Sequence, residues 1–221
     1  MKTMIDSQGR RLYLHKISEK TELCKGFLLV CFGYIFCYMF MLDYTVEGMN
    51  IFHRESTASG TVHEHPVLFG IWLLLCATTF FLNLDILRRK YSLGHMKTLV
   101  IMQYAGLIFL GCIYIFRLPS AYPPYEKFSD VLQFALHVAS TVISFAANGI
   151  LLLLVILIKF KEDKRWKPFV IIAAIFVVLV GVGFATITSV FMETVPLMFV
   201  MAILYMLNYT DVVKPKEASK A

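Results

Sequence analysis

Charged residues are scarce in this sequence, at 16% of the chain, whereas hydrophobic residues make up 58%. The mean hydropathy is +0.70. No soluble domain of this length needs so much apolar surface, so the composition excludes an ordinary soluble protein and indicates an integral membrane protein. A membrane-spanning helix takes about 20 mainly apolar residues, and the chain has room for several of them with short connections.

The motifs of several enzyme classes are missing. There is no HExxH of a zinc protease, no GxSxG nucleophile elbow and no Gly-rich phosphate loop. The five cysteines have no CxxC or Cys/His ligand spacing and fall in or beside apolar runs, so we expect reduced, buried thiols. His137 is the only histidine expected deep inside a span, which leaves a bis-histidine haem without its second ligand. The sequence therefore indicates no particular cofactor.

Six apolar runs predict an all-α, polytopic bundle of six transmembrane helices. Glu193 and Pro196 interrupt the last run, which predicts a tight hairpin rather than one long helix. The first 23 or so residues are polar and form no cleavable signal pattern, so the first helix is expected to be its own insertion signal. The expected spans are 26–42, 66–87, 98–116, 130–158, 168–191 and 195–207.

Lysine and arginine fix the expected orientation. Of the 21 such residues, all but Arg54, Arg117 and Lys127 fall on one side of the predicted bundle. Cytoplasmic loops carry this excess, so both termini are expected in the cytoplasm, with the protein in the cell (plasma) membrane. The basic charge therefore indicates topology in a lipid bilayer and not nucleic-acid binding.

Two short regions flank the predicted transmembrane domain, 26–208. Residues 1–25 mix Leu12, Leu14 and Ile17 with basic neighbours, as an interfacial helix on the inner membrane surface would. A disordered tail fits the same residues equally well. Residues 209–221 are expected to form a cytoplasmic C-terminal tail.

A polar ladder on the fourth predicted span is the main candidate site. Its members recur at helical spacing and fall on one face, and lipid cannot satisfy their hydrogen bonds. They must therefore face other helices or a water-filled cavity, where they would bind substrate. The alternative is a structural role, in which these side chains join helices through interhelical hydrogen bonds. A structural role is the favoured interpretation for Ser140, Thr141 and Ser144. For His137, a structural and a functional role are weighed equally. The ladder consists of Asp130, Gln133, His137, Ser140, Thr141, Ser144 and Asn148.

Three smaller features complete the sequence-based expectations. His63 and His65 flank Glu64 at the start of the second span and are weak candidates for metal ligands, with a solvated loop end as the favoured interpretation. Asp85 lies one turn from Arg88, where ion pairing is routine. Gly181, Ala185 and Ser189 form a row of small residues at helical spacing, which predicts a close helix contact first and a binding surface second.

Three functions fit these patterns. The first is a transporter or permease-type membrane subunit with a polar cavity lined by the fourth helix. The second is a membrane enzyme that acts on a lipid or lipid-linked substrate near the outer face, with His63, His65 and His137 as acid, base or metal ligands. The third is a non-catalytic membrane partner or assembly factor. A partner subunit and a homo-oligomer both stay open, as does the question of enzyme activity.

Overall fold

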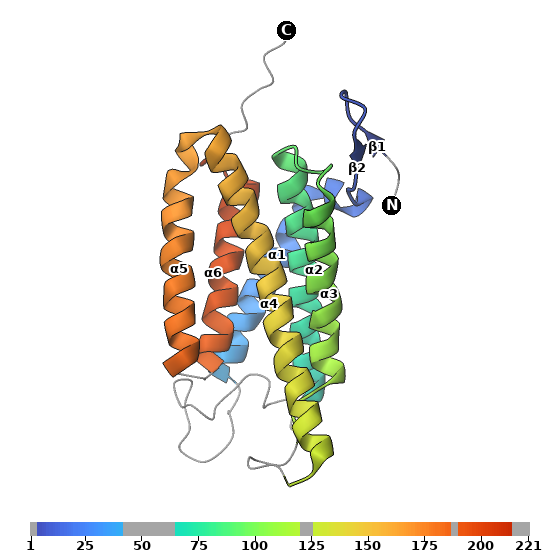
Figure 1. Cartoon of the computed structure of the whole chain (residues 1–221), viewed down its shortest axis with the longest axis vertical. Coiled ribbons are helices and arrows are strands. Elements are labelled where there is room, and N and C mark those ends of the chain that lie inside the picture. Colours follow the sequence, from blue (N-terminus) through green and yellow to red (C-terminus); the bar gives the residue numbers. More distant parts are fainter. Residues whose placement is uncertain (1–3, 42–64, 120–125, 187–189, 214–221) are drawn as a thin grey trace.

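The computed structural model describes residues 4–41, 65–119, 126–186 and 190–213, and for 4, 39–41, 184–186 and 190–192 it describes the backbone alone. Six α-helices account for most of these residues (Figure 1). Their bounds are α1, Thr21–Met41; α2, Pro66–Lys90; α3, Lys97–Ile115; α4, Phe128–Glu162; α5, Lys167–Thr186; and α6, Val190–Tyr209.

The helices have the length and composition of membrane spans. Helices α1 to α5 are long and apolar enough to cross a bilayer, and α6 contains a shorter apolar stretch, Glu193–Tyr209. This confirms an all-helical membrane bundle, while the count of six spans stays a prediction. Large apolar side chains of α5 point outward, as expected of a helix that faces lipid. Among them are Ile175, Val178 and Leu179, which are 55%, 63% and 64% exposed, respectively.

The boundary between the last two helices differs from the expectation. Helix α5 ends at Thr186 and α6 already begins at Val190, so Pro196 lies inside α6 and does not precede it. Glu193 falls in the first turn of α6, where the helix dipole favours an acidic side chain. A proline inside a membrane helix is tolerated because neighbouring groups satisfy the freed carbonyl. Glu193 therefore belongs to the start of α6 and not to the loop before it, whereas Pro196 lies inside the helix, as it does in the predicted span 195–207.

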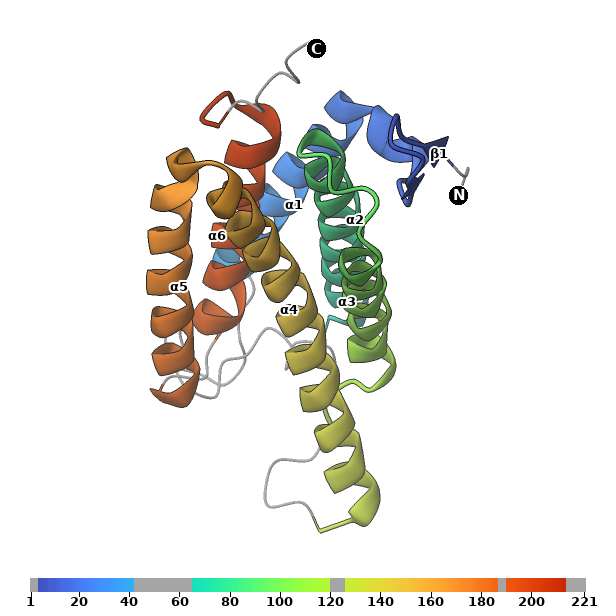
Figure 2. The same ribbon diagram turned by 45° about the horizontal axis from the view of Figure 1, so that its top comes forward.

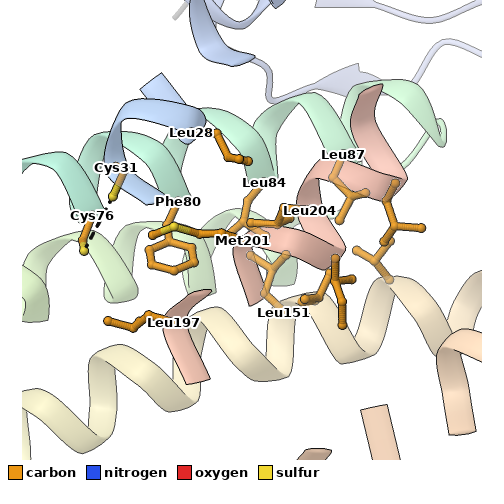
Figure 3. Close-up of a cluster of buried hydrophobic side chains, with 14 of the residues drawn as sticks. Leu28, Cys31, Cys76, Phe80, Leu84, Leu87, Leu151, Leu197, Met201 and Leu204 are labelled. Carbon is orange, nitrogen blue, oxygen red and sulfur yellow. Dashed lines mark hydrogen bonds between the residues drawn. The ribbon is translucent and has the colours of Figure 1, made fainter. Parts of the chain in front are cut away.

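Helix α2 packs against α1, α3 and α6, whereas α4 pairs with α3, and α5 packs against α4 and α6 at the opposite side of the bundle from α2 and α3 (Figures 1 and 2). Side chains from α1, α2, α4 and α6 meet in the hydrophobic core shown in Figure 3. Leu28, Leu84, Leu151, Met201 and Leu204 are all 2% exposed or less.

One end of the bundle carries a cluster of basic residues, among them Lys90, Lys97, Lys159 and Arg165. We call it the basic end. It is formed by the N-terminal segment, the α2–α3 turn, the short 3-10 helix η3 (Lys164–Trp166) and the end of α6 (Figure 1). At the opposite, far end, the first turns of α4 extend beyond α3 (Figure 2).

The N-terminal segment forms a small folded unit in place of a continuous surface helix. Strands β1 (Met4–Ile5) and β2 (Arg11–Leu12) pair antiparallel, and a 3-10 helix, η1 (Lys16–Glu19), follows. Gly9 adopts a φ of 74° in the turn, and the Asp6 carboxylate accepts the backbone N–H groups of Gln8 and Arg10. Such turn chemistry competes with helix formation, which explains the difference from the interfacial helix considered above.

Candidate functional site

The polar ladder of α4 faces α3. The Gln133 amide donates to the Arg117 carbonyl at 2.7 Å, and His137 Nδ1 lies 2.8 Å from the Phe116 carbonyl oxygen. Deeper in the bundle, the Ser144 hydroxyl donates to the Gly106 carbonyl at 3.0 Å. These bonds connect polar groups across a helix interface, and burial increases from Gln133 to Ser144. Polar side chains commonly join membrane helices in this way.

The other ladder members form hydrogen bonds within α4, are buried, or lie near the start of the helix. Thr141 donates to the His137 carbonyl and Asn148 donates to the Ser144 carbonyl, each at 2.9 Å. Ser140 is buried at 3% exposure, and Asp130 accepts the neighbouring Ser129 hydroxyl at 3.3 Å. The ladder thus runs along the α3–α4 interface.

A cavity of about 440 Å³ lies between α4, α5 and α6. Its wall is apolar except for Ser144 and Asn148 on α4 and Glu193 at the start of α6. All three polar residues line the half nearer the far end, because α4 and α6 run from the far end to the basic end. The half nearer the basic end is lined by apolar residues such as Ile156, Ala173 and Ile203.

Two glycines that line this cavity, Gly149 and Gly181, contribute to its open space because they have no side chain. A β-carbon added to Gly149 or Gly181 would meet no atom within 4 Å. The close contact expected at Gly181 is therefore not formed, and Gly181 lines the cavity wall; Ala185 and Ser189 of the same row lie outside the described side chains.

A second polar cluster, centred on Asp85 of α2, occupies the basic end. Asp85 is completely buried and pairs with Arg88, as the sequence predicted. Its carboxylate also accepts the Ser18 hydroxyl at 2.6 Å, the His15 backbone N–H at 2.9 Å and a bond from His15 Nδ1 at 3.1 Å. On the other side of the ring, His15 Nε2 lies 2.7 Å from the Tyr104 hydroxyl on α3. The cluster ties the N-terminal segment to α2 and α3.

The end of α6 is fastened to α2 at the same level. Lys90 donates to the carbonyls of Leu207, Asn208 and Thr210 at 2.7, 3.2 and 3.1 Å, where its charge complements the helix dipole. The Tyr91 hydroxyl donates to the Leu207 carbonyl at 3.1 Å. Burial raises the pKa of Tyr91 to about 12, because the phenolate would lose its hydration.

The proposed metal ligands gain no support from the described residues. His65 precedes α2 as its cap, and His63 lies outside the described part of the chain. Among the residues that the structure describes, no group of three His, Cys, Asp or Glu side chains is arranged to hold a metal ion.

Comparison of the chain with protein-family models, with curated proteins and with solved structures finds no match.

Sequence reasoning found the ladder and the Asp85 pair with Arg88 but missed His15, Ser18 and Tyr104. His15 and Asp85 are 70 positions apart, and His15 and Tyr104 are 89 apart. The one feature of the sequence that indicated such partners was Asp85 itself, because a carboxylate within an otherwise apolar helix needs a polar or charged partner.

Proposed function

We propose that this protein is a membrane carrier for a lipid-like molecule, whose long apolar part is held in the cavity between α4, α5 and α6. The observation that carries the proposal is the cavity itself, which has the volume and apolar wall of a ligand pocket, with a few polar groups to fix orientation. A bilayer supplies lipid as the most abundant molecule that fits such a wall.

The shape of the cavity supports a molecule with one polar end. Along α4 the lining extends from Ser144 to Ile156, about 18 Å at roughly 1.5 Å per residue. The polar end of the substrate would lie near Glu193 and Asn148, with its apolar chain directed toward Ile156. This refines the polar cavity expected from the sequence, since the polar groups are confined to one half of the wall.

Most of the ladder has a positioning role in this proposal. Gln133, His137 and Ser144 hold α4 against α3, which keeps the neighbouring face of α4 in place as one wall of the cavity. Ser144 and Asn148 also line the cavity, so they are the ladder members that we expect to contact the substrate.

We further propose that the basic end faces the cytoplasm and that the protein lies in the cell membrane. Lys90, Lys97, Lys159 and Arg165 belong to this end of the described chain, and the positive-inside rule places such clusters in the cytoplasm. A reporter that is active only outside the cytoplasm, fused after Ala221, should be inactive if this orientation holds and active if it does not.

Filling the cavity tests lipid binding. Leucine at Gly149 or Gly181 would place four carbons in open space without a steric conflict at the β-carbon. Native mass spectrometry after extraction in mild detergent should show one retained lipid in the wild type and its loss from Gly149→Leu and Gly181→Leu. Gly111→Leu is the matched control, because Gly111 has equal space but lies on α3, away from the cavity.

The carrier step has a separate assay. In liposomes that contain a phosphatidylcholine with a fluorescent acyl chain, the wild type and Gly111→Leu should accelerate exchange of the label between leaflets, and the filled variants should not. Exchange at the protein-free rate would refute the carrier role. Equal lipid retention by all four proteins would refute the binding site as well.

A further inference from the structure

The three residues Asp85, His15 and Tyr104 form a continuous hydrogen-bonded chain that ends at the membrane surface of the bundle. Asp85 is fully buried, the His15 side chain is 15% exposed, and Tyr104 is 37% exposed. The order is therefore a buried carboxylate, a shielded imidazole and an accessible hydroxyl.

The direction of the hydrogen bonds follows from the carboxylate. An ionised carboxylate only accepts, so the Nδ1 atom of His15 carries the proton that faces Asp85. In the neutral imidazole, Nε2 is then the lone-pair nitrogen, and it accepts the Tyr104 O–H at 2.7 Å. A carboxylate that orients a histidine, which in turn contacts a hydroxyl, is the arrangement that activates hydroxyl nucleophiles.

The surroundings hold this arrangement in place. The His15 ring packs against Phe81 at 4.7 Å and against the Tyr104 ring at 5.7 Å between centroids. The His15 backbone N–H is bound to Asp85 as well, so both the ring and the main chain of His15 are fixed.

A buried positive charge lies beside the carboxylate. The Arg88 guanidinium pairs with Asp85, and its Nε and Nη1 atoms are buried without a hydrogen-bond partner among the described residues. Arg88 therefore holds the Asp85 end of the hydrogen-bonded chain in its ionised form.

The depth of Tyr104 indicates the substrate class. Tyr104 lies seven residues into α3, about 10 Å from the helix start at 1.5 Å per residue. The headgroup layer on each side of a bilayer is about 5–8 Å thick. With the start of α3 placed at the outer edge of that layer, the Tyr104 hydroxyl would lie just inside the boundary between headgroups and hydrocarbon. Ester bonds of glycerolipids occur at that boundary.

We propose that Asp85, His15 and Tyr104 form an acyl-transfer site for ester-linked lipids at the basic end, with Tyr104 as the nucleophile. Tyr104 Oη attacks the ester carbonyl carbon while its proton passes to His15 Nε2. The bond between that carbon and the glycerol oxygen breaks, and the glycerol oxygen takes the proton from His15. Water then hydrolyses the acyl-tyrosine with His15 as base, which releases a fatty acid and restores Tyr104. Asp85 is a positioning residue, and the site is independent of the cavity described above.

The first test measures whether Tyr104 is activated. A membrane-permeant aryl sulfonyl fluoride forms a bond between the phenolic oxygen and sulfur and releases fluoride, with the phenolic proton passing to the base. Peptide mass spectrometry should show Tyr104 labelled at least tenfold faster than Tyr114, a threshold set below the roughly 10²–10⁴-fold that general-base catalysis typically contributes. Tyr114 is the matched control, because it is 46% exposed on the same helix and has no histidine beside it among the described contacts.

His15→Gln should slow labelling of Tyr104 to the rate of Tyr114 and leave Tyr114 unchanged. A purely structural His15 predicts the reverse, because loosening the N-terminal segment would expose Tyr104 and speed its labelling. Equal rates for the two tyrosines in the wild type would overturn the proposal without any variant having to fold.

The second test addresses the substrate. Wild-type protein in vesicles of phosphatidylglycerol and phosphatidylethanolamine should release fatty acid and lysolipid, as should Tyr114→Phe, whereas Tyr104→Phe should not. No release by the wild type, or equal release by Tyr104→Phe, would overturn the ester-lipid assignment.

Discussion

Gly106 of α3 lies so close to Asn148 of α4 that a β-carbon at position 106 would stand 2.6 Å from the Asn148 amide nitrogen. The Gly106 carbonyl also accepts the Ser144 hydroxyl at 3.0 Å. Small residues permit this kind of close approach between membrane helices, and polar bonds then reinforce it. Helices α3 and α4 are therefore closely packed at the level of Gly106 and Asn148.

The close approach predicts that Gly106→Ala destabilises the protein by about 1–3 kcal/mol, the usual range for overpacking. The measurement is thermal unfolding in detergent. In the double variant Gly106→Ala/Asn148→Ala, part of the loss should return, because the second change removes the atoms in conflict. Gly111→Ala should have little effect, since its added β-carbon meets no atom within 4 Å. Additive losses in the double variant would contradict the contact.

Replacing His137 should lower stability without abolishing lipid retention. His137→Leu removes the bond to the Phe116 carbonyl, and polar bonds between membrane helices contribute about 0.6 kcal/mol each. A small drop in the unfolding temperature is expected, together with wild-type lipid retention by native mass spectrometry. Unchanged stability combined with lost retention would instead make His137 a substrate ligand, which is the alternative that the sequence left open.

Tyr91 predicts a specific loss of stability at alkaline pH. Its pKa is raised to about 12 in the folded protein by burial, above the value of about 10 for a free tyrosine. Folding therefore favours the protonated form, so this contribution is complete below about pH 10 and is lost as the pH rises toward 12. Tyr91→Phe should show a smaller decrease of the unfolding temperature between pH 8 and pH 11 than the wild type. Parallel pH profiles would contradict the assignment.

The thiols of Cys31 on α1 and Cys76 on α2 lie 3.9 Å apart in the core (Figure 3). We expect iodine, which is small and enters membranes, to oxidise this pair to a disulfide while it is itself reduced to iodide. Peptide mass spectrometry should find the Cys31–Cys76 cross-link and none between Cys24 and Cys76. A Cys24–Cys76 product, or none at all, would contradict the packing of α1 on α2.

The helices were predictable because apolar runs and basic clusters are local signals that do not depend on the fold. The ladder was predictable as a face of one helix, but the sequence did not reveal which neighbour that face meets. The break between the last two helices was predictable, but the start of α6 was placed five residues too late, at 195 instead of 190, because Glu193 and Pro196 were taken as interruptions and a membrane helix tolerates a proline. The bonds of Asp85 to His15 and Ser18 depend on the tertiary placement of the N-terminal segment, for which periodicity gives no signal.

The cavity was not predictable from the sequence for a related reason. Gly149, Gly181 and Ala173 come from two different helices, and only their packing shows that their small size leaves space instead of allowing close contact. Ile175 and Leu179 are exposed on the other side of α5, so that side of the helix faces outward and away from the cavity.

The most direct test of lipid binding is to map where a lipid chain lies. A phosphatidylcholine with a diazirine near the middle of one acyl chain can be photolysed with the protein in nanodiscs, and the labelled residues identified by peptide mass spectrometry. Bulk lipid will label the outward residues Ile175 and Leu179 in any case. If a lipid occupies the cavity, Ala173 and Phe176 on the inward side of α5 are labelled as well, and Gly149→Leu removes that labelling while leaving Ile175 and Leu179 labelled. Labelling confined to the outward residues in the wild type would contradict the central claim.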